Sequence, residues 1–165
     1  MPLAHHRDPG VLGAAYTHSE LKVQLIADGV HVHPLIIRFL VQVKGPGGVL
    51  LISDAMPAAG LPDGMYDFAG HHVTVRQGKA YLEDGTLAGS TATLDEAIRV
   101  IVTQTDIPLQ QAARMAGLNA ARVLKVDDRK GVIAAGYDAD LVVLDNNLEV
   151  EMTILGGKIV HSSSD

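Results

Sequence analysis

Residues 21–55, LKVQLIADGVHVHPLIIRFLVQVKGPGGVLLISDA, contain the pattern that decides the fold. LKVQLIAD (21–28) alternates and then becomes wholly apolar, which is typical of a strand buried on both faces. PLIIRFLVQVKG (34–45) predicts a helix whose apolar face carries Ile36, Ile37, Leu40 and Val41. GGVLLISDA (47–55) predicts a second apolar strand. This order predicts a βαβ unit with parallel strands, and therefore an α/β fold.

The next segment has a different pattern. GMYDFAGHHVTVRQGKAYLEDGT (64–86) alternates around Gly78 and predicts an antiparallel hairpin. His71 and His72 lie within it, and we expect them to be surface residues of a strand.

The last third predicts helices followed by short strands. Thr93 and Glu96 have the spacing of a capping box, which predicts a helix over 93–105. PLQQAARMAGLNAARVL (108–124) predicts a second, alanine-rich helix, and the remainder predicts short strands with a turn at Gly156 and Gly157.

Composition limits the class of protein. A chain of 165 residues with 47% hydrophobic residues can bury a real core. A net charge of −6 and only 4% aromatic residues argue against nucleic-acid binding. The absence of cysteine excludes disulfides and thiolate metal sites. The first residues, MPLAHHRDPGVLGAAY, contain no apolar stretch of signal-peptide length, and no run is long enough to cross a bilayer, so we expect a cytoplasmic protein without membrane contact.

The ends of the two predicted strands are the natural place for function. Functional groups of parallel α/β folds gather where strands meet their following loops, and both Asp28 and Asp54 occupy such positions. We expect Asp54 to be partly desolvated, which suits a proton shuttle beside a metal-bound water. A cap of the turn in SDAMPAAG explains Asp54 equally well.

His31 and His33 allow two interpretations. Residues two apart on a strand point to the same side, so the pair could bind a metal ion. Alternatively, one histidine faces the strand mouth and the other caps the next helix. Metal sites usually need three or four ligands, and no third ligand follows from the pattern.

The order of motifs resembles one enzyme family along nearly the whole chain. HHRDPGVLGAA, ADGVHVHP, LISDAMPAAG, DGTLAGSTATL and GVIAAGYDADLVVLD follow one another as in the N-acetylglucosamine-6-phosphate deacetylases of the amidohydrolase superfamily. The resemblance implies the last two strands and helices of a (β/α)₈ TIM-type barrel, plus part of a small β-sandwich. It implies that residues 1–125 belong to the barrel, with the hairpin near 64–86 inserted, and residues 126–165 to the sandwich.

The resemblance also implies roles for individual residues. Asp54 matches the catalytic aspartate that takes a proton from the attacking water and delivers one to the departing amine. His31 matches a substrate ligand rather than a metal ligand, and His33 receives no role. Arg7 in HRDPG matches an arginine that holds the sugar phosphate, although an ordinary loop salt bridge would also explain it. Leu87, Ala88 and Gly89 match a loop that contacts substrate through its backbone, with Ala88 in place of the usual serine.

The metal ligands implied by the resemblance, a glutamate and two histidines, lie upstream of Met1. We therefore expect no metal site within this sequence, and an enzyme that uses a divalent metal, zinc or a close relative. The implied reaction is hydrolysis of N-acetylglucosamine 6-phosphate to glucosamine 6-phosphate and acetate, by a homodimer, with this chain inactive alone. Two alternatives stay open: another amide hydrolase of the superfamily, and a non-catalytic truncated assembly module.

A partial barrel has a structural consequence. The seventh and eighth strands would lack their outer partners, which leaves two open edges and an uncovered apolar face. We expect a companion to cover them, either the missing N-terminal half or another copy of the chain.

Overall fold

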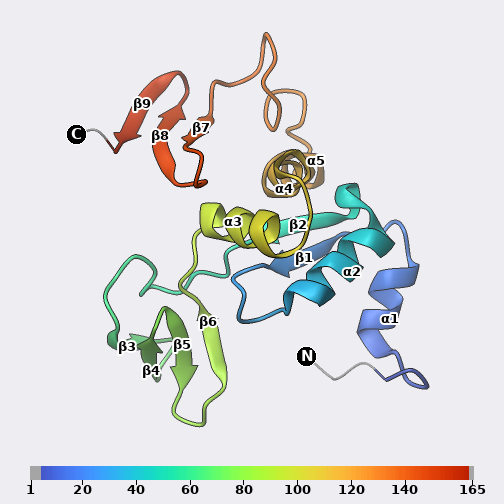
Figure 1. The fold of residues 1–165 in the computed structure, drawn as a ribbon, viewed down its shortest axis with the longest axis vertical. Coiled ribbons are helices and arrows are strands. Elements are labelled where there is room, and N and C mark those ends of the chain that lie inside the picture. The colour runs from blue at the N-terminus through green and yellow to red at the C-terminus, as the bar shows by residue number, and fades with distance from the viewer. Residues whose placement is uncertain (1–4, 164–165) are drawn as a thin grey trace.

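The computed structural model describes residues 5–163, which form a mixed α/β structure with three small sheets (Figure 1). A two-stranded sheet with its helices lies in the middle of the molecule, a four-stranded sheet lies at one end and a three-stranded sheet at the other. The short helix α1 (Gly10–Thr17) lies beside α2 (Pro34–Lys44). The predicted α/β class is therefore confirmed.

The central unit is the predicted βαβ unit. Strands β1 (Val23–Ile26) and β2 (Val49–Ile52) pair in parallel, and α2 connects them, followed by a 3₁₀ turn, η1 (Pro46–Gly48). Beyond this pair, no other strand in residues 5–163 joins the sheet, so both of its outer edges are open.

Helix α2 buries one face against the sheet through Ile37, Leu40 and Val41. The expectation that Ile36 joins this face is wrong, because its side chain is 48% exposed. Successive residues of a helix are about 100° apart, so Ile36 lies at the edge of a face centred on Ile37.

Helix α3 (Leu94–Gln104) begins with the predicted capping box, in which the Thr93 N–H donates to Glu96 Oε2 at 2.9 Å. It packs together with β1, β2 and α2 in one apolar core, whose buried members are Leu25, Ala27, Ile37, Leu40, Val41, Val49, Leu51, Ala97, Ile101, Ile107, Ala112 and Met115. This core fixes the positions of the two strand ends.

The single helix expected over 108–124 is instead two helices, α4 (Leu109–Ala116) and α5 (Leu118–Val123). The break falls at Gly117, whose φ of −117° and ψ of −80° are not helical. Beyond it, buried Asn119 donates from Nδ2 to the carbonyl oxygens of Pro46 at 2.7 Å and Val49 at 2.6 Å. These bonds attach α5 to the start of β2.

The expected hairpin is part of a larger antiparallel sheet. Its strands are β3 (Gly64–Phe68), β4 (His71–Arg76), β5 (Lys79–Leu82) and β6 (Leu87–Ser90). Gly78, with φ +68°, lies in the turn between β4 and β5 as predicted. The expectation of a loop at residues 87–89 is wrong, because they belong to β6 and pair with β5.

The C-terminal sheet contains β7 (Leu141–Leu144), β8 (Val150–Leu155) and β9 (Lys158–Ser162), all antiparallel. Gly156 and Gly157 form the turn between β8 and β9 with positive φ angles, as predicted. Within the described part of the chain, no helix is long and apolar enough to cross a membrane.

Candidate functional site at the strand ends

Three segments meet where the central strands end. The Asp28 turn follows β1, Asp54 follows β2, and the end of β6 runs beside Asp54. The structure thereby brings together the segments of His31, Asp54 and Leu87–Gly89, which are far apart in sequence.

Asp54 is held by its backbone and not by its side chain. Its carbonyl oxygen accepts the Ser90 N–H at 2.9 Å, and the Met56 N–H donates to the Ser90 carbonyl at 2.8 Å. Asp54 has a φ of 51°, a left-handed conformation that aspartate tolerates better than most residues. Its side chain is exposed, so the expectation of partial desolvation is wrong for this chain. An exposed carboxylate at a strand end is accessible to a reacting group.

Gly89 allows β6 to approach Asp54 closely. A Cβ atom on Gly89 would lie 3.2 Å from the Asp54 carbonyl oxygen, and the φ of Gly89 is +87°. Leu87 and Ala88 are half-buried, and Ala88 packs against the second apolar cluster, formed by Met56, Ala58, Val73, Val75 and Ala80. The small residues of β6 thus serve the backbone contact between β6 and the Asp54 turn.

Asp28 organises the turn that carries His31. Asp28 Oδ1 accepts the N–H groups of Val30 and His31, each at 2.9 Å. Its Oδ2 lies 2.7 Å from His31 Nδ1 and accepts the Ser90 hydroxyl at 2.8 Å. The imidazole of His31 is therefore bound through Nδ1, and within residues 5–163 Nε2 has no hydrogen-bond partner.

The electrostatics of this turn favour a charged carboxylate. Burial by itself would raise the pKa of Asp28, but the backbone N–H groups of His31 and Val30 and the side chains of His31 and Ser90 outweigh it. The pKa of Asp28 consequently lies below its usual value. Asp28 is an ionised acceptor at neutral pH.

His33 has a structural function that matches one of the two interpretations of the pair. Its Nδ1 accepts the Leu35 N–H at 3.2 Å, and it is the N-cap residue of α2. His31 faces Asp28 instead. One histidine at the strand mouth and the other at the helix cap is therefore what the structure shows.

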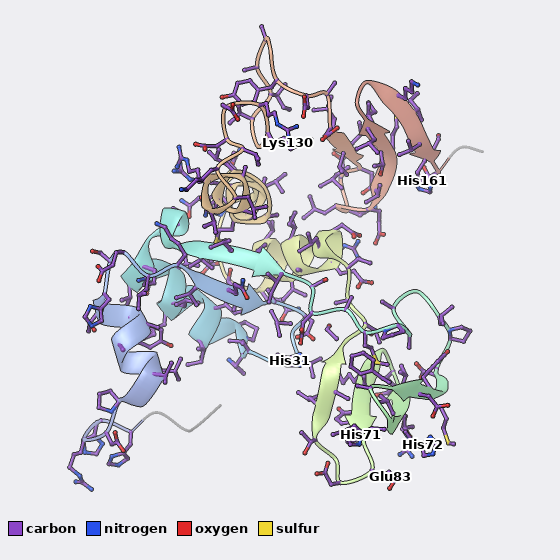
Figure 2. The ribbon with its side chains drawn as sticks, turned by 180° about the vertical axis from the view of Figure 1, so that it is seen from behind. His31, His71, His72, Glu83, Lys130 and His161 are labelled. Atoms are coloured by element: carbon purple, nitrogen blue, oxygen red, sulfur yellow. The ribbon has the colours of Figure 1, made fainter. Side chains whose placement is uncertain are left out.

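The described residues do not fit a metal centre. No group of three or more His, Asp or Glu side chains in residues 5–163 is arranged to hold a cation. Figure 2 shows why: His71 and His72 lie at the distal end of the four-stranded sheet, His161 lies in the C-terminal sheet, and His31 lies near the strand ends. His71 and His72 are exposed strand residues, as expected.

Arg7 lies in an exposed turn before α1. His5 and Asp8 exchange backbone hydrogen bonds across this turn, and the Arg7 N–H donates to His5 Nδ1 at 3.3 Å. The guanidinium makes no ion pair with any described residue, so the alternative of a loop salt bridge is not observed.

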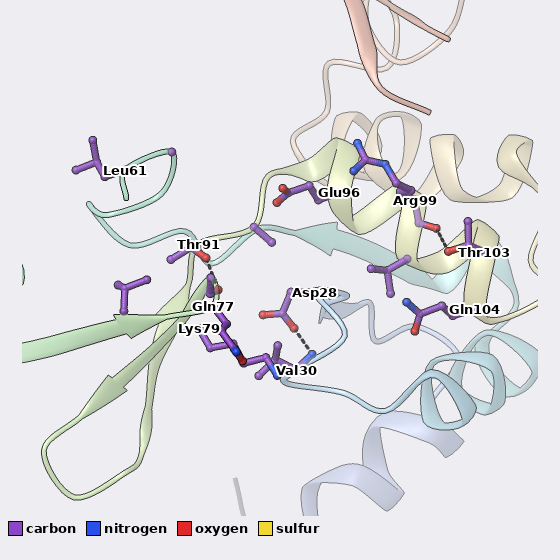
Figure 3. A pocket seen from close by; sticks show the side chains of 15 residues that line it. Asp28, Val30, Leu61, Gln77, Lys79, Thr91, Glu96, Arg99, Thr103 and Gln104 are labelled. Atoms are coloured by element: carbon purple, nitrogen blue, oxygen red, sulfur yellow. Dashed lines mark hydrogen bonds between the residues drawn. The ribbon is translucent and has the colours of Figure 1, made fainter. Parts of the chain in front are cut away.

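A pocket of about 500 Å³ lies between α3 and the turn of β4 and β5, with Asp28 in its lining (Figure 3). Asp28, Val30, Lys79, Glu96 and Arg99 are among its lining residues. Neither Asp54 nor His31 lines it. This pocket therefore adjoins the strand-end site through the Asp28 turn but contains neither His31 nor Asp54.

Sequence reasoning missed two participants. The strand-end pattern indicates Asp28 but not its contact with His31. The available signal is the D-x-x-H spacing, which is typical of a side chain that accepts backbone N–H groups two and three residues later. Ser90 gave no such signal, because it lies 62 residues from Asp28.

The amidohydrolase family matches residues 14–160. The N-acetylglucosamine-6-phosphate deacetylase of Bacillus subtilis is 44% identical over 161 residues, which are 98% of this chain and 41% of that protein. The N-acetylgalactosamine-6-phosphate deacetylase of Escherichia coli O157:H7 is 40% identical over 155 residues, 94% of this chain and 41% of that protein. The crystal structure of N-acetylglucosamine-6-phosphate deacetylase from Thermotoga maritima superposes with a TM-score of 0.91 at 39% identity, and covers 98% of this chain and 44% of that one. The chain thus spans about two fifths of the length of these relatives, and it belongs to the amidohydrolase family.

Proposed function

We propose that this chain forms the C-terminal portion of an enzyme that hydrolyses N-acetylglucosamine 6-phosphate to glucosamine 6-phosphate and acetate. The observation that carries the proposal is the meeting of His31 and Asp54 at adjacent strand ends, joined through Ser90. The names of the similar proteins support an amino-sugar phosphate as substrate. The fold class that fits is the end of a (β/α)₈ barrel, residues 1–125, followed by part of a β-sandwich, residues 126–165.

In this reaction Asp54 carries protons. Water attacks the acetamide carbonyl carbon and gives a proton to the Asp54 carboxylate; the C–N bond then breaks as Asp54 returns that proton to the amine nitrogen. The oxygen of the water leaves in acetate, so all atoms are accounted for. The carboxylate of Asp54 is exposed, which leaves it accessible to a water molecule and to a substrate amide.

His31, Arg7 and the strand β6 would hold the sugar. His31 presents Nε2 because Nδ1 is bound to Asp28. The exposed guanidinium of Arg7 suits a phosphate, since a planar fork of N–H groups binds such an anion strongly. Leu87, Ala88 and Gly89 would contact substrate through their backbone.

The amidohydrolase family is metal-dependent. Because residues 5–163 offer no three-ligand site, the cation, zinc or a close relative, would have to be held by another polypeptide segment. That segment is also the expected partner of the open strand edges. We expect a homodimer of the completed enzyme in the cytoplasm.

The test is reconstitution. The chain is assayed for acetate release from N-acetylglucosamine 6-phosphate alone, and after mixing with the N-terminal three fifths of the B. subtilis relative and a divalent cation. We expect activity only in the mixture, and a loss of about 10²–10⁴-fold in kcat with Asp54→Asn. Asp128→Asn, at an exposed residue outside the site, is the matched control.

The substrate panel separates the alternatives. N-acetylgalactosamine 6-phosphate is the second candidate substrate, supported by the name of the E. coli relative. Turnover of an amide that lacks the phosphate, with no turnover of either sugar phosphate, would favour a different amide hydrolase. A stable but inactive complex would favour the non-catalytic assembly module.

A further inference from the structure

Asp28 is the most fully engaged carboxylate near the strand ends. Its side chain is only 6% exposed, and both of its oxygens have two polar partners. The two on Oδ1 are backbone N–H groups of its own turn. The two on Oδ2 come from His31 and from Ser90, on a strand of a different sheet. The two contacts to Oδ2 are not required to form the turn, whose backbone is already held by the two contacts to Oδ1.

We propose that Asp28 and Ser90 are positioning residues that keep the proton of neutral His31 on Nδ1, so that Nε2 faces the substrate as a hydrogen-bond acceptor. Only the second half of this proposal, that Nε2 faces the substrate, rests on the proposed function. The state of the imidazole follows from this chain alone.

The tautomer follows from the donor and acceptor inventory. An ionised carboxylate has no proton to donate, so the hydrogen in the 2.7 Å contact must come from His31 Nδ1. Ser90 also donates to Oδ2 and accepts the Ala92 N–H at 3.1 Å, so its hydroxyl hydrogen is committed to Asp28. The partners of Asp28 are then all donors, which leaves Nε2 of neutral His31 without a proton.

This assignment restricts what His31 can recognise. An unprotonated Nε2 accepts a hydrogen bond from a hydroxyl or an amide N–H, and it repels the acceptor-only oxygens of a dianionic phosphate. We therefore assign His31 to a sugar hydroxyl or the amide N–H of the substrate. The anionic end of the substrate then falls to other groups, such as Arg7.

Ser90 also connects the two halves of the site. Its side chain holds Asp28, and its N–H holds the carbonyl of Asp54 at 2.9 Å. One residue of β6 thus fixes both the orientation of the binding histidine and the turn of the proton carrier. A change at Ser90 is expected to affect both.

The test reads the His31 tautomer directly by ¹⁵N NMR at about pH 8.5, well above the usual histidine pKa of about 6.5. We expect the His31 proton on Nδ1 in the wild-type chain. In Asp28→Asn the two backbone N–H groups still require an oxygen at the Oδ1 position, so the new amide NH₂ faces His31 and moves the proton to Nε2. His33, whose Nδ1 accepts the Leu35 N–H, is an internal reference with its proton on Nε2 in every variant.

Two further variants keep the test decisive. Asp145→Asn is the matched control, because Asp145 Oδ1 also accepts two backbone N–H groups, from Asn147 and Glu149, and should leave the His31 tautomer unchanged. Ser90→Ala should keep the proton on Nδ1 but speed its exchange with solvent. A wild-type proton on Nε2, or the same tautomer in wild type and Asp28→Asn, would overturn the role of Asp28; unchanged exchange in Ser90→Ala would overturn that of Ser90.

The orientation of His31 Nε2 toward the substrate is tested in the reconstituted enzyme. Asp28→Asn places a donor opposite a donor, so KM is expected to rise about tenfold or more, with a much smaller change in kcat. An unchanged KM beside a switched tautomer would overturn this part. If the reconstituted wild-type mixture is inactive, the proposed function is contradicted, and the NMR result alone decides the tautomer.

Discussion

The carbonyl oxygen of Asp54 lies 3.2 Å from the point that a Cβ atom on Gly89 would occupy. Gly89 belongs to β6, whereas Asp54 lies in the loop after β2, and Ser90 fixes their approach by donating its N–H to the same carbonyl. The backbone of the proposed proton carrier is therefore held against a position where only glycine fits without a shift. Local geometry at Gly89 is coupled to the placement of Asp54.

Gly89→Ala is expected to destabilise the fold by more than the backbone strain of a positive φ angle alone would. A left-handed alanine costs about 1–2 kcal/mol, and the close contact with the Asp54 carbonyl should add about 1 kcal/mol or more. Gly85→Ala is the control, because Gly85 has a similar φ of +85° but nothing within 4 Å of the added methyl group. Urea unfolding of both variants gives the difference, and equal losses would show that the contact with Asp54 is unimportant.

The central unit could be predicted because its signals are local. Buried strands β1 and β2 are continuous apolar runs, and α2 has its own helical periodicity. Strand β6 could not be predicted, because Leu87–Ser90 is short and rich in small residues. It is stabilised by pairing with β5 and by backbone hydrogen bonds to Asp54 and Met56. The break at Gly117 could not be predicted either, because the alanine-rich composition that favours a helix continues on both sides of it.

The site shows the same limit. The strand-end rule correctly indicated the positions of His31 and Asp54, and a choice between metal ligand and substrate ligand for His31 came only from the family resemblance. The structure shows only that the two histidines have different partners, since His31 Nδ1 contacts Asp28 and His33 Nδ1 caps α2. The contribution of Ser90 depends on the packing of β6 against the Asp28 turn, which no short sequence pattern encodes.

Acid should weaken the fold partly through Asp28. The pKa of Asp28 is lower in the folded chain than in the unfolded chain, where it is about 3.9, so its stabilising contribution is complete above about pH 4 and is lost as the pH falls through the folded pKa. Asp28→Asn should remove this part of the acid dependence and lower stability at neutral pH.

The measurement is the urea midpoint from neutral pH to about pH 3 for wild type and Asp28→Asn. The two curves should converge toward low pH. Asp128→Asn controls for the loss of one carboxylate charge at an exposed position. Parallel curves for wild type and Asp28→Asn would contradict the role of the hydrogen bonds at Asp28.

Asn119→Ala is expected to cost about 1–3 kcal/mol. The buried side chain of Asn119 donates to the carbonyls of Pro46 and Val49, and alanine would leave both without this donor at the start of β2. Asn147→Ala, on the exposed turn before β8, is the control and should change stability less. Thermal or urea unfolding checks the difference; similar losses at the two sites would show that the α5–β2 attachment contributes little.

The isolated chain is expected to associate through its uncovered surfaces. Both outer edges of the β1–β2 pair are open in the described residues, and the outer face of α2 exposes an apolar stripe at Leu35, Phe39 and Val43. Sedimentation velocity over a range of concentrations should show reversible association. The double substitution Leu35→Gln with Val43→Gln should weaken it at least about tenfold, because covering the exposed parts of these two side chains contributes about 1.5–3 kcal/mol. Leu155→Gln with Val160→Gln, at exposed positions of the distant C-terminal sheet, is the matched control.

Two outcomes would contradict this prediction. A wild-type chain that stays monomeric at every concentration would mean that neither the open edges nor the α2 face requires a companion. Association lost equally in both double variants would mean that the contact lies elsewhere.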